Sequence, residues 1–158
     1  MKEVDYIIVG LGIAGISFCE TLRKNKKSFV VYDPGINHST VVSGGVFNPV
    51  VLKRFTAVWR GSEFLEKAIP FYEEISKKLK VDLLENTPIY RVLNSIEEQN
   101  DWMVTSDKKA LSPFLSSEII KNENTAIKAS YGFGKVLECG KINPSKLISA
   151  YRDYLQET

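Results

Sequence analysis

The segment that governs the architecture of this chain is YIIVGLGIAG, residues 6–15. Its first four residues are apolar and predict a short strand buried on both faces, as in a parallel sheet. Three glycines follow with the spacing GxGxxG, at Gly10, Gly12 and Gly15. Glycine at these positions allows a tight turn, a close approach of backbone to a phosphate, and close packing of a helix on the strand.

A helix and a second strand follow the glycines. Apolar residues recur from Ile13 to Leu22 and predict a helix that ends at Lys24. The run FVVY at 29–32 predicts another buried strand, and Asp33 comes directly after it. This βαβ unit predicts a Rossmann-type α/β fold, in which the helix N-terminus holds a pyrophosphate and the acid holds a ribose. Because the acid disfavours a 2′-phosphate, NADP is not expected.

Residues 38–49, HSTVVSGGVFNP, show no clear period. Small and hydroxyl side chains with a Gly-Gly pair suit a loop that lies along a long, extended cofactor, which favours FAD over NAD. Two alternatives stay open: an NAD-dependent enzyme, and a non-catalytic dinucleotide-binding module that needs a partner chain. His38, the single histidine, is expected to face solvent.

The rest of the chain predicts part of a smaller α+β substrate domain. A helix is expected to begin near Ser62 and to be kinked or split by Pro70. Ser95 with Glu98 forms a capping box that opens another helix. The remaining predictions are strands at 88–93 and 133–138, loops around one short helix at 106–130, and a last helix that begins at Asn143 and Pro144.

These elements divide the chain into three regions. We expect an FAD-binding region at 1–85, part of a substrate domain at 86–135, and a return into the first domain at 136–158. No buried strand follows the last helix, so its apolar face is expected to lie open. The chain is therefore expected either to self-associate as a homo-oligomer or to lack a C-terminal half, and to bind FAD weakly on its own. The residues of that face are Leu147, Ile148, Tyr151 and Leu155.

Composition excludes several classes of protein. With 158 residues, of which 44% are hydrophobic, the chain can bury a core. A net charge of +2 is too small to predict nucleic-acid binding. The apolar runs are too short for a membrane span, and Glu3 and Asp5 do not fit a secretory signal. One histidine and two separated cysteines make no metal site, and we expect a cytoplasmic protein with Cys19 and Cys139 buried.

Three features together resemble the D-amino acid oxidase-like family of FAD-dependent oxidoreductases. They are the N-terminal GxGxxG, Asp33, and the stretch SGGVFNP at 43–49. The region around 90–98 and the segment GKINP at 140–144 extend the resemblance over most of the chain. Family members often carry Glu where Asp33 stands and are much longer, so the resemblance is to their N-terminal half.

The resemblance implies an oxidoreductase that transfers a hydride from a C–H next to the nitrogen of an amine or amino acid to flavin N5. It would place the pyrophosphate on the glycines, a ribose on Asp33, phosphates beside Thr40, and the flavin ring on the backbone at 44–46. No catalytic residue is predicted. For Lys53, Arg54 and Arg60 we favour a solvated loop over ligands of an anionic substrate or of the flavin N1–C2=O edge. The candidate cofactor-binding residues are Gly10, Leu11, Gly12, Ile13, Ala14, Gly15, Asp33, Pro34, Thr40, Ser43, Gly44, Gly45 and Val46.

Overall fold

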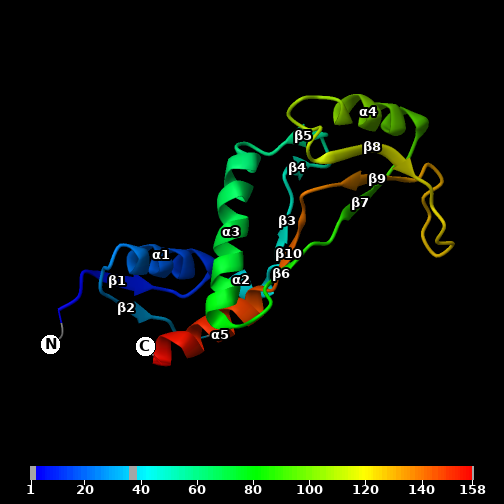
Figure 1. The fold of residues 1–158 in the computed structure, drawn as a ribbon. Coiled ribbons are helices and arrows are strands. Elements are labelled where there is room, and N and C mark those ends of the chain that lie inside the picture. Colours follow the sequence, from blue (N-terminus) through cyan, green and yellow to red (C-terminus); the bar gives the residue numbers. More distant parts are fainter. Residues whose placement is uncertain (1–2, 36–38, 158) are drawn as a thin grey trace. The chain divides into compact units, whose positions relative to one another are not determined.

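The computed structural model of the chain describes residues 3–35 and 39–157, which form two compact units (Figure 1). The first unit takes its residues from 1–45, 74–83 and 143–158. The second unit is made of 46–73 and 84–142. Each unit mixes helices and strands, and the α/β fold class predicted from the sequence is confirmed.

The first unit is built around the predicted βαβ segment. Strand β1 (Tyr6–Val9) pairs in parallel with β2 (Phe29–Tyr32), and α1 (Ile13–Lys24) connects them. The register runs from Tyr6 opposite Phe29 to Val9 opposite Tyr32. The strands and the helix begin and end where the apolar pattern and the glycines place them.

Burial of β1 differs from the prediction. Ile8 is only 6% exposed, whereas Ile7 and Val9 are 66% and 84% exposed. Successive side chains of a strand point to opposite faces, and α1 covers the Ile8 face, since a Cβ at Gly15 would lie 3.8 Å from Ile8 Cγ2. In the part of the chain that the structure describes, β1 is therefore buried on one face instead of two.

The last helix, α5 (Pro144–Glu157), packs on α1 and on the short helix α2 (Ser39–Val42). It begins as predicted, with Asn143 Oδ1 accepting a hydrogen bond from Lys146 N at 3.0 Å. Its side chains Leu147, Ile148 and Tyr151 are at most 2% exposed. The prediction of an open apolar face on this helix is wrong, because α1 and α2 provide the surface that covers it.

A buried carboxylate joins segments of three helices within the first unit. Glu20 of α1 is only 3% exposed. Its Oε1 accepts a hydrogen bond from the Tyr151 hydroxyl of α5 at 2.8 Å, and its Oε2 pairs with Lys78 Nζ near the end of α3 (Gly61–Leu79). Burial, followed by the contact with Glu20, raises the pKa of Tyr151 far above its ordinary value. The Tyr151 hydroxyl therefore stays protonated and donates its hydrogen bond to Glu20.

Helix α3 continues through Pro70 without a break. The predicted split is wrong. Proline cannot donate one backbone hydrogen bond, but the other backbone hydrogen bonds of this 19-residue helix hold it together.

The second unit centres on a three-stranded antiparallel sheet with the order β7–β9–β8. Helix α4 (Ile96–Ser106) packs on β8 and inserts Trp102, which is fully buried. The indole Nε1 donates to Ser116 O at 2.8 Å, and Gly134 leaves room for the ring. The strands are β7 (Ile89–Val92), β8 (Leu115–Ile120) and β9 (Phe133–Val136).

The sequence predicted loops around one short helix at 106–130 and missed β8. The strand is irregular, with a register shift between Leu115 and Ile119 that interrupts the alternation of apolar and polar side chains. Two smaller sheets also escaped prediction because their strands have only two or three residues. They are β3 (Val46–Phe47), β10 (Gly140–Ile142) and β6 (Leu84–Glu85) in one sheet, and β4 (Val50–Val51) with β5 (Thr56–Ala57) in the other.

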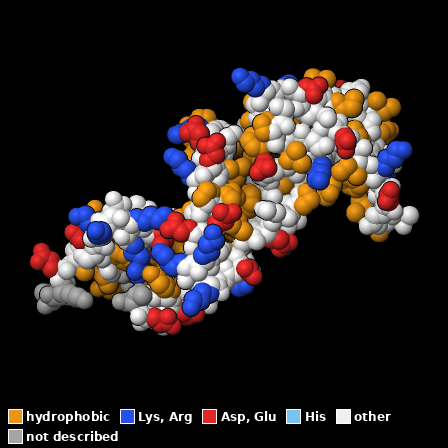
Figure 2. Space-filling view, in the orientation of Figure 1, with side chains coloured by type: hydrophobic (Ala, Val, Ile, Leu, Met, Phe, Trp, Pro, Cys, Tyr) orange, Lys and Arg blue, Asp and Glu red, His pale blue; other side chains and the backbone are white. Residues whose placement is uncertain are grey.

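Two aromatic residues of the second unit are largely exposed. Trp59 and Phe64 are 75% and 49% exposed, and Arg60 lies over both rings. Figure 2 shows basic and acidic side chains interspersed over the visible face, with hydrophobic patches between them. None of the described helices combines the length and the apolar character that a membrane span requires.

Candidate functional site

The glycine loop between β1 and α1 has the geometry that only glycine readily provides. Gly10 has φ +93°, in the left-handed region, and its N–H donates to Tyr32 O of β2 at 2.8 Å. A Cβ at Gly15 would collide with the carbonyl oxygen of Gly10. The turn therefore brings the start of α1 against the end of the strand.

Thr40 lies over the N-terminus of α1. Its hydroxyl oxygen accepts a hydrogen bond from Ile13 N at 3.1 Å, and a Cβ at Gly12 would stand 3.1 Å from the same oxygen. The first N–H groups of a helix have no acceptor within it, and they carry the positive end of the helix dipole. Thr40 accepts the hydrogen bond of one of these groups, the N–H of Ile13. The N–H groups of Ala14 and Gly15 follow in the same turn. A phosphate is the kind of ligand that such a helix start binds.

Asp33 extends from the end of β2 toward the glycine loop. Its Oδ2 accepts a hydrogen bond from Leu11 N at 2.5 Å, and its Oδ1 accepts one from Gly35 N at 2.6 Å. The side chain is only 8% exposed. The carboxylate is thus fixed beside the loop that would hold a pyrophosphate, at the place where a ribose would follow it.

Arg152 of α5 is the residue of this site that sequence reasoning missed. Its Nη2 lies 3.2 Å from Asp33 Oδ1. The two residues are 119 positions apart, and nothing in the pattern of α5 distinguishes this arginine from a solvated one. An open groove of about 810 Å³ runs along β2 at this point, and its walls include Leu11, Asp33, Arg152 and two further cations, Arg23 and Lys27.

The structure gathers most of the predicted site residues in the first unit. Ser43 donates its hydroxyl hydrogen to Thr40 O at 2.7 Å, and Gly45 has φ +64°. Pro34 and Gly44 are exposed neighbours of Asp33 and Gly45 in the chain. Val46 is the exception, because it begins β3 of the second unit, where it pairs with Lys141.

Other residues considered from the sequence lie away from this loop or outside the described part. His38 lies outside the described residues. Lys53 and Arg54 are exposed in the second unit. Arg60 pairs with Glu63 at 2.5 Å and stacks on aromatic rings, so it is engaged locally.

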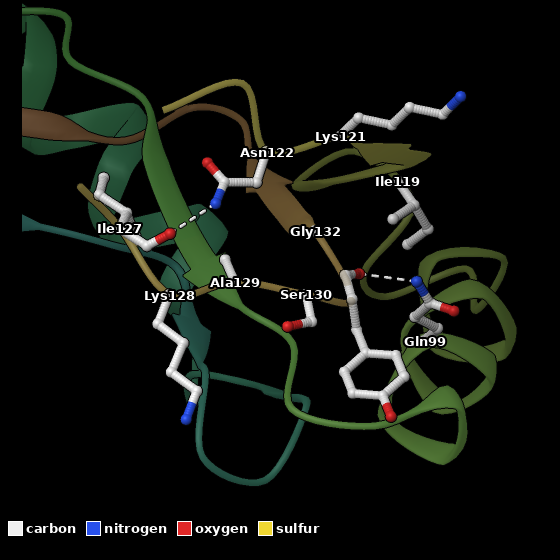
Figure 3. A pocket seen from close by; sticks show the side chains of 10 residues that line it. Gln99, Ile119, Lys121, Asn122, Ile127, Lys128, Ala129, Ser130 and Gly132 are labelled. Atoms are coloured by element: carbon white, nitrogen blue, oxygen red, sulfur yellow. Dashed lines mark hydrogen bonds between the residues drawn. The ribbon is translucent and has the colours of Figure 1, made fainter. Parts of the chain in front are cut away.

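A second open pocket, of about 690 Å³, lies where the loop between β8 and β9 meets α4 (Figure 3). The two side-chain amides of this pocket bind backbone carbonyl groups. Gln99 Nε2 donates to Tyr131 O and Asn122 Nδ2 donates to Ile127 O, both at 2.6 Å. Figure 3 shows the side chains of Lys121 and Lys128 pointing apart. These polar groups hold the loop together and do not converge on one point.

Both cysteines are buried, as predicted, and Cys139 lies directly before β10. Burial raises the pKa of each thiol above its ordinary value. The protonated thiols are poor nucleophiles. Neither cysteine is therefore a candidate for covalent chemistry.

No family model matches the chain. Comparison with solved structures nevertheless identifies the fold as one of amino acid oxidase type. Glycine oxidase from Bacillus cereus ATCC 14579 matches with a TM-score of 0.68 and 16% identity, over 94% of this chain and 42% of that one. L-amino acid deaminase from Proteus myxofaciens, in complex with anthranilate, matches with a TM-score of 0.71 and 15% identity, over 99% and 37%. L-amino acid deaminase from Proteus vulgaris matches with a TM-score of 0.69 and 17% identity, over 99% of this chain and 38% of that one.

These matches confirm the resemblance to the D-amino acid oxidase-like family at the level of the fold. The likeness covers nearly the whole chain, including the second unit, where the sequence motifs were least specific. The chain spans about two fifths of the length of the structures it matches.

Proposed function

We propose that the chain forms the dinucleotide-binding part of an FAD-dependent oxidoreductase that acts on amines or amino acids. The observation that carries this proposal is the convergence of the glycine loop, Thr40 and Asp33 at the start of α1. The fold shared with glycine oxidase and L-amino acid deaminase supports the substrate class.

The residues present fit the adenosine diphosphate half of FAD. Gly12 keeps clear a space beside Thr40 that a side chain would fill. The first turn of α1 supplies N–H donors for an anion, and the Asp33 carboxylate is an acceptor for ribose hydroxyls. NAD shares this half with FAD, so the preference for FAD rests on the fold and on the loop that follows α2.

Each residue of the site has a distinct task in this proposal. Gly10 and Gly15 set the position of the helix start, Thr40 fixes the first N–H of α1, and Asp33 orients the ribose. When bound, FAD would supply the hydride acceptor for a C–H next to an amine nitrogen. The chain's own residues bind and orient the cofactor, and none of them is assigned a proton transfer.

Substitution of Gly12 by valine tests the proposal. The added methyl groups would occupy the space reserved for a phosphate, so Gly12→Val should abolish FAD binding while the fold persists. Binding is measured by the change in flavin fluorescence on titration, and folding by circular dichroism. Ala126→Val adds methyl groups at an exposed loop of the second unit and should leave FAD affinity unchanged.

Three results would contradict the proposal. The first is a folded Gly12→Val chain that binds FAD as the unsubstituted chain does. The second is a chain that binds NAD and not FAD, which would favour a nicotinamide enzyme. The third is FAD that binds to the chain, completed by whatever partner it requires, but is not bleached by any amine or amino acid, which would favour a binding module without catalysis.

A further inference from the structure

Among the described residues, strand β2 pairs only with β1, so its outer edge has no partner strand. Tyr32 O accepts a hydrogen bond from Gly10 N, and Ser28 O likewise accepts one from the start of β1. The backbone groups of successive strand residues point to opposite edges, so the N–H and C=O groups of Phe29 and Val31 point outward. These groups have no hydrogen-bond partner within residues 3–35 and 39–157.

An open groove of about 810 Å³ runs along this outer edge. Its walls include every residue of β2 and Leu155 of α5, which is half-buried. Arg23 of α1 lies over the rings of Phe29 and Tyr154, 5.5 and 4.8 Å from their centroids. Because β2 and the end of α5 contact the same residue of α1, α5 lies beside α1 on the Phe29 side of the sheet.

The layer of helices in the first unit is wider than the sheet it covers. Packed helices lie about 8–10 Å apart, whereas neighbouring strands lie about 4.8 Å apart, so one helix covers about two strands. Helix α1 connects β1 and β2 and covers one face of them. The end of α5, with Leu155, continues this layer past the edge of β2 and over the groove. The groove is therefore the place of a further strand.

We propose that the groove along β2 binds an extended segment of polypeptide, which adds a third strand to the β1–β2 sheet. Pairing with the outward groups of Phe29 and Val31 supplies the affinity, and every second side chain of the segment, which is apolar, lies against Leu155. The inference goes beyond the proposed function, because the pairing does not involve the glycine loop.

The length of the matched structures indicates where the segment comes from. This chain covers 42%, 37% and 38% of the three structures described above, so about three fifths of each has no counterpart in these 158 residues. The segment that occupies the groove belongs to that remaining part of the fold.

The probe is a library of blocked octapeptides that are apolar at every second position and randomised at the others. Peptides retained by the 158-residue chain are added to it in solution, and amide hydrogen exchange is followed by NMR. The amides of Phe29 and Val31 should exchange at least about ten-fold more slowly in the complex. The amides of Val30 and Tyr32, which point to β1, should change little.

Val31→Pro removes the outward donor and leaves the groups that face β1 in place, as proline at the edge of a sheet allows. Because its ring projects toward the added strand, the dissociation constant of a selected peptide should rise at least about ten-fold. Val31→Thr keeps the N–H group and nearly the same shape, and should leave the constant within about two-fold. The same peptide with every second amide N-methylated should lose as much affinity for the unsubstituted chain, so the test holds even where Val31→Pro does not fold.

Three results would overturn the proposal. They are a library from which no peptide binds, peptides that protect the amides of Ile7 and Val9 on the outer edge of β1 or those of the second unit, and an affinity that neither Val31→Pro nor N-methylation lowers. Gly12→Val separates this inference from the proposed function. It should bind the selected peptides as the unsubstituted chain does, so either proposal can fail without the other.

Discussion

A single carboxylate ties the end of β2 to the glycine loop. Asp33 accepts a hydrogen bond from Leu11 N of the loop at 2.5 Å and is almost excluded from solvent. Hydrogen bonds to a charged acceptor are worth about 1.5–3 kcal/mol, more than those to a neutral one. The charge on this residue therefore matters for any ribose that binds there.

Asp33→Asn keeps the shape of the side chain and removes its charge, so FAD affinity should fall roughly ten-fold or more. The measurement is a flavin fluorescence titration. Asp5→Asn is the matched control, because Asp5 also accepts a backbone hydrogen bond, from Ser28 N at 2.8 Å, but at the other end of the strands. An unchanged dissociation constant in Asp33→Asn would separate Asp33 from the ribose.

Glu20 is the second residue on which the first unit depends. Removing Lys78 takes the nearer cation from the buried Glu20 carboxylate and leaves Arg23, whose Nε lies 4.0 Å from Oε1. Because a buried charge then loses part of its compensation, Lys78→Met should lower the free energy of unfolding by about 1–3 kcal/mol, measured by urea denaturation. Lys77→Met removes the exposed neighbour on the same helix and should change it by less than about 0.5 kcal/mol. Equal effects of the two substitutions would show that the Glu20 pair is not important for stability.

Among the elements, α4 has the most completely defined start. Ser95 Oγ accepts from Glu98 N at 3.1 Å, and the Glu98 carboxylate accepts from Asn94 N at 2.8 Å. The backbone hydrogen bond from Asn94, followed by the contacts with its side chain and with Arg91, lowers the pKa of Glu98 below its ordinary value. Glu98 thus stabilises the folded state in its ionised form.

The consequence for pH follows from the sign of that shift. A carboxyl whose pKa is lower in the folded chain stabilises above its unfolded pKa, and this stabilisation is lost as the pH falls through the folded pKa. Glu98→Gln should therefore reduce stability at pH 7 and weaken its decrease toward acid, measured by thermal unfolding between pH 7 and 3. Glu97→Gln, on the exposed side of the same turn, should leave the pH profile as it is. If the stability of Glu98→Gln fell toward acid as steeply as that of the unsubstituted chain, ionised Glu98 would not be a source of the stability.

At the scale of elements, local patterns predicted what is local. The glycine spacing and the apolar runs placed β1, α1 and β2, and the capping residues placed α4 and α5. Strand β8 was missed because its pairing with β9 depends on residues distant in the chain and its register shifts between Leu115 and Ile119. The small sheets were missed for another reason, because strands of only two or three residues are too short to show a period.

At the scale of the whole molecule, the proximity of the glycine loop and Asp33 could be predicted, because their spacing in the sequence reflects one βαβ unit. Arg152 could not, because its contact with Asp33 spans 119 positions and exists only once α5 packs on α1. The exposed face of β1 was also beyond prediction, because an apolar run does not reveal how many layers will cover it.

The interleaving of the two units along the chain has a consequence for the order of events during synthesis. The βαβ segment leaves the ribosome first, but the Tyr151 hydroxyl that bonds Glu20 lies 131 residues further on. At translation rates of about 5–20 residues per second, roughly 7–26 s pass before α5 can cover α1. During that interval the nascent chain exposes to water the Glu20 carboxylate and the apolar face of α1 that α5 later covers, and transiently exposed apolar surface of this kind favours aggregation.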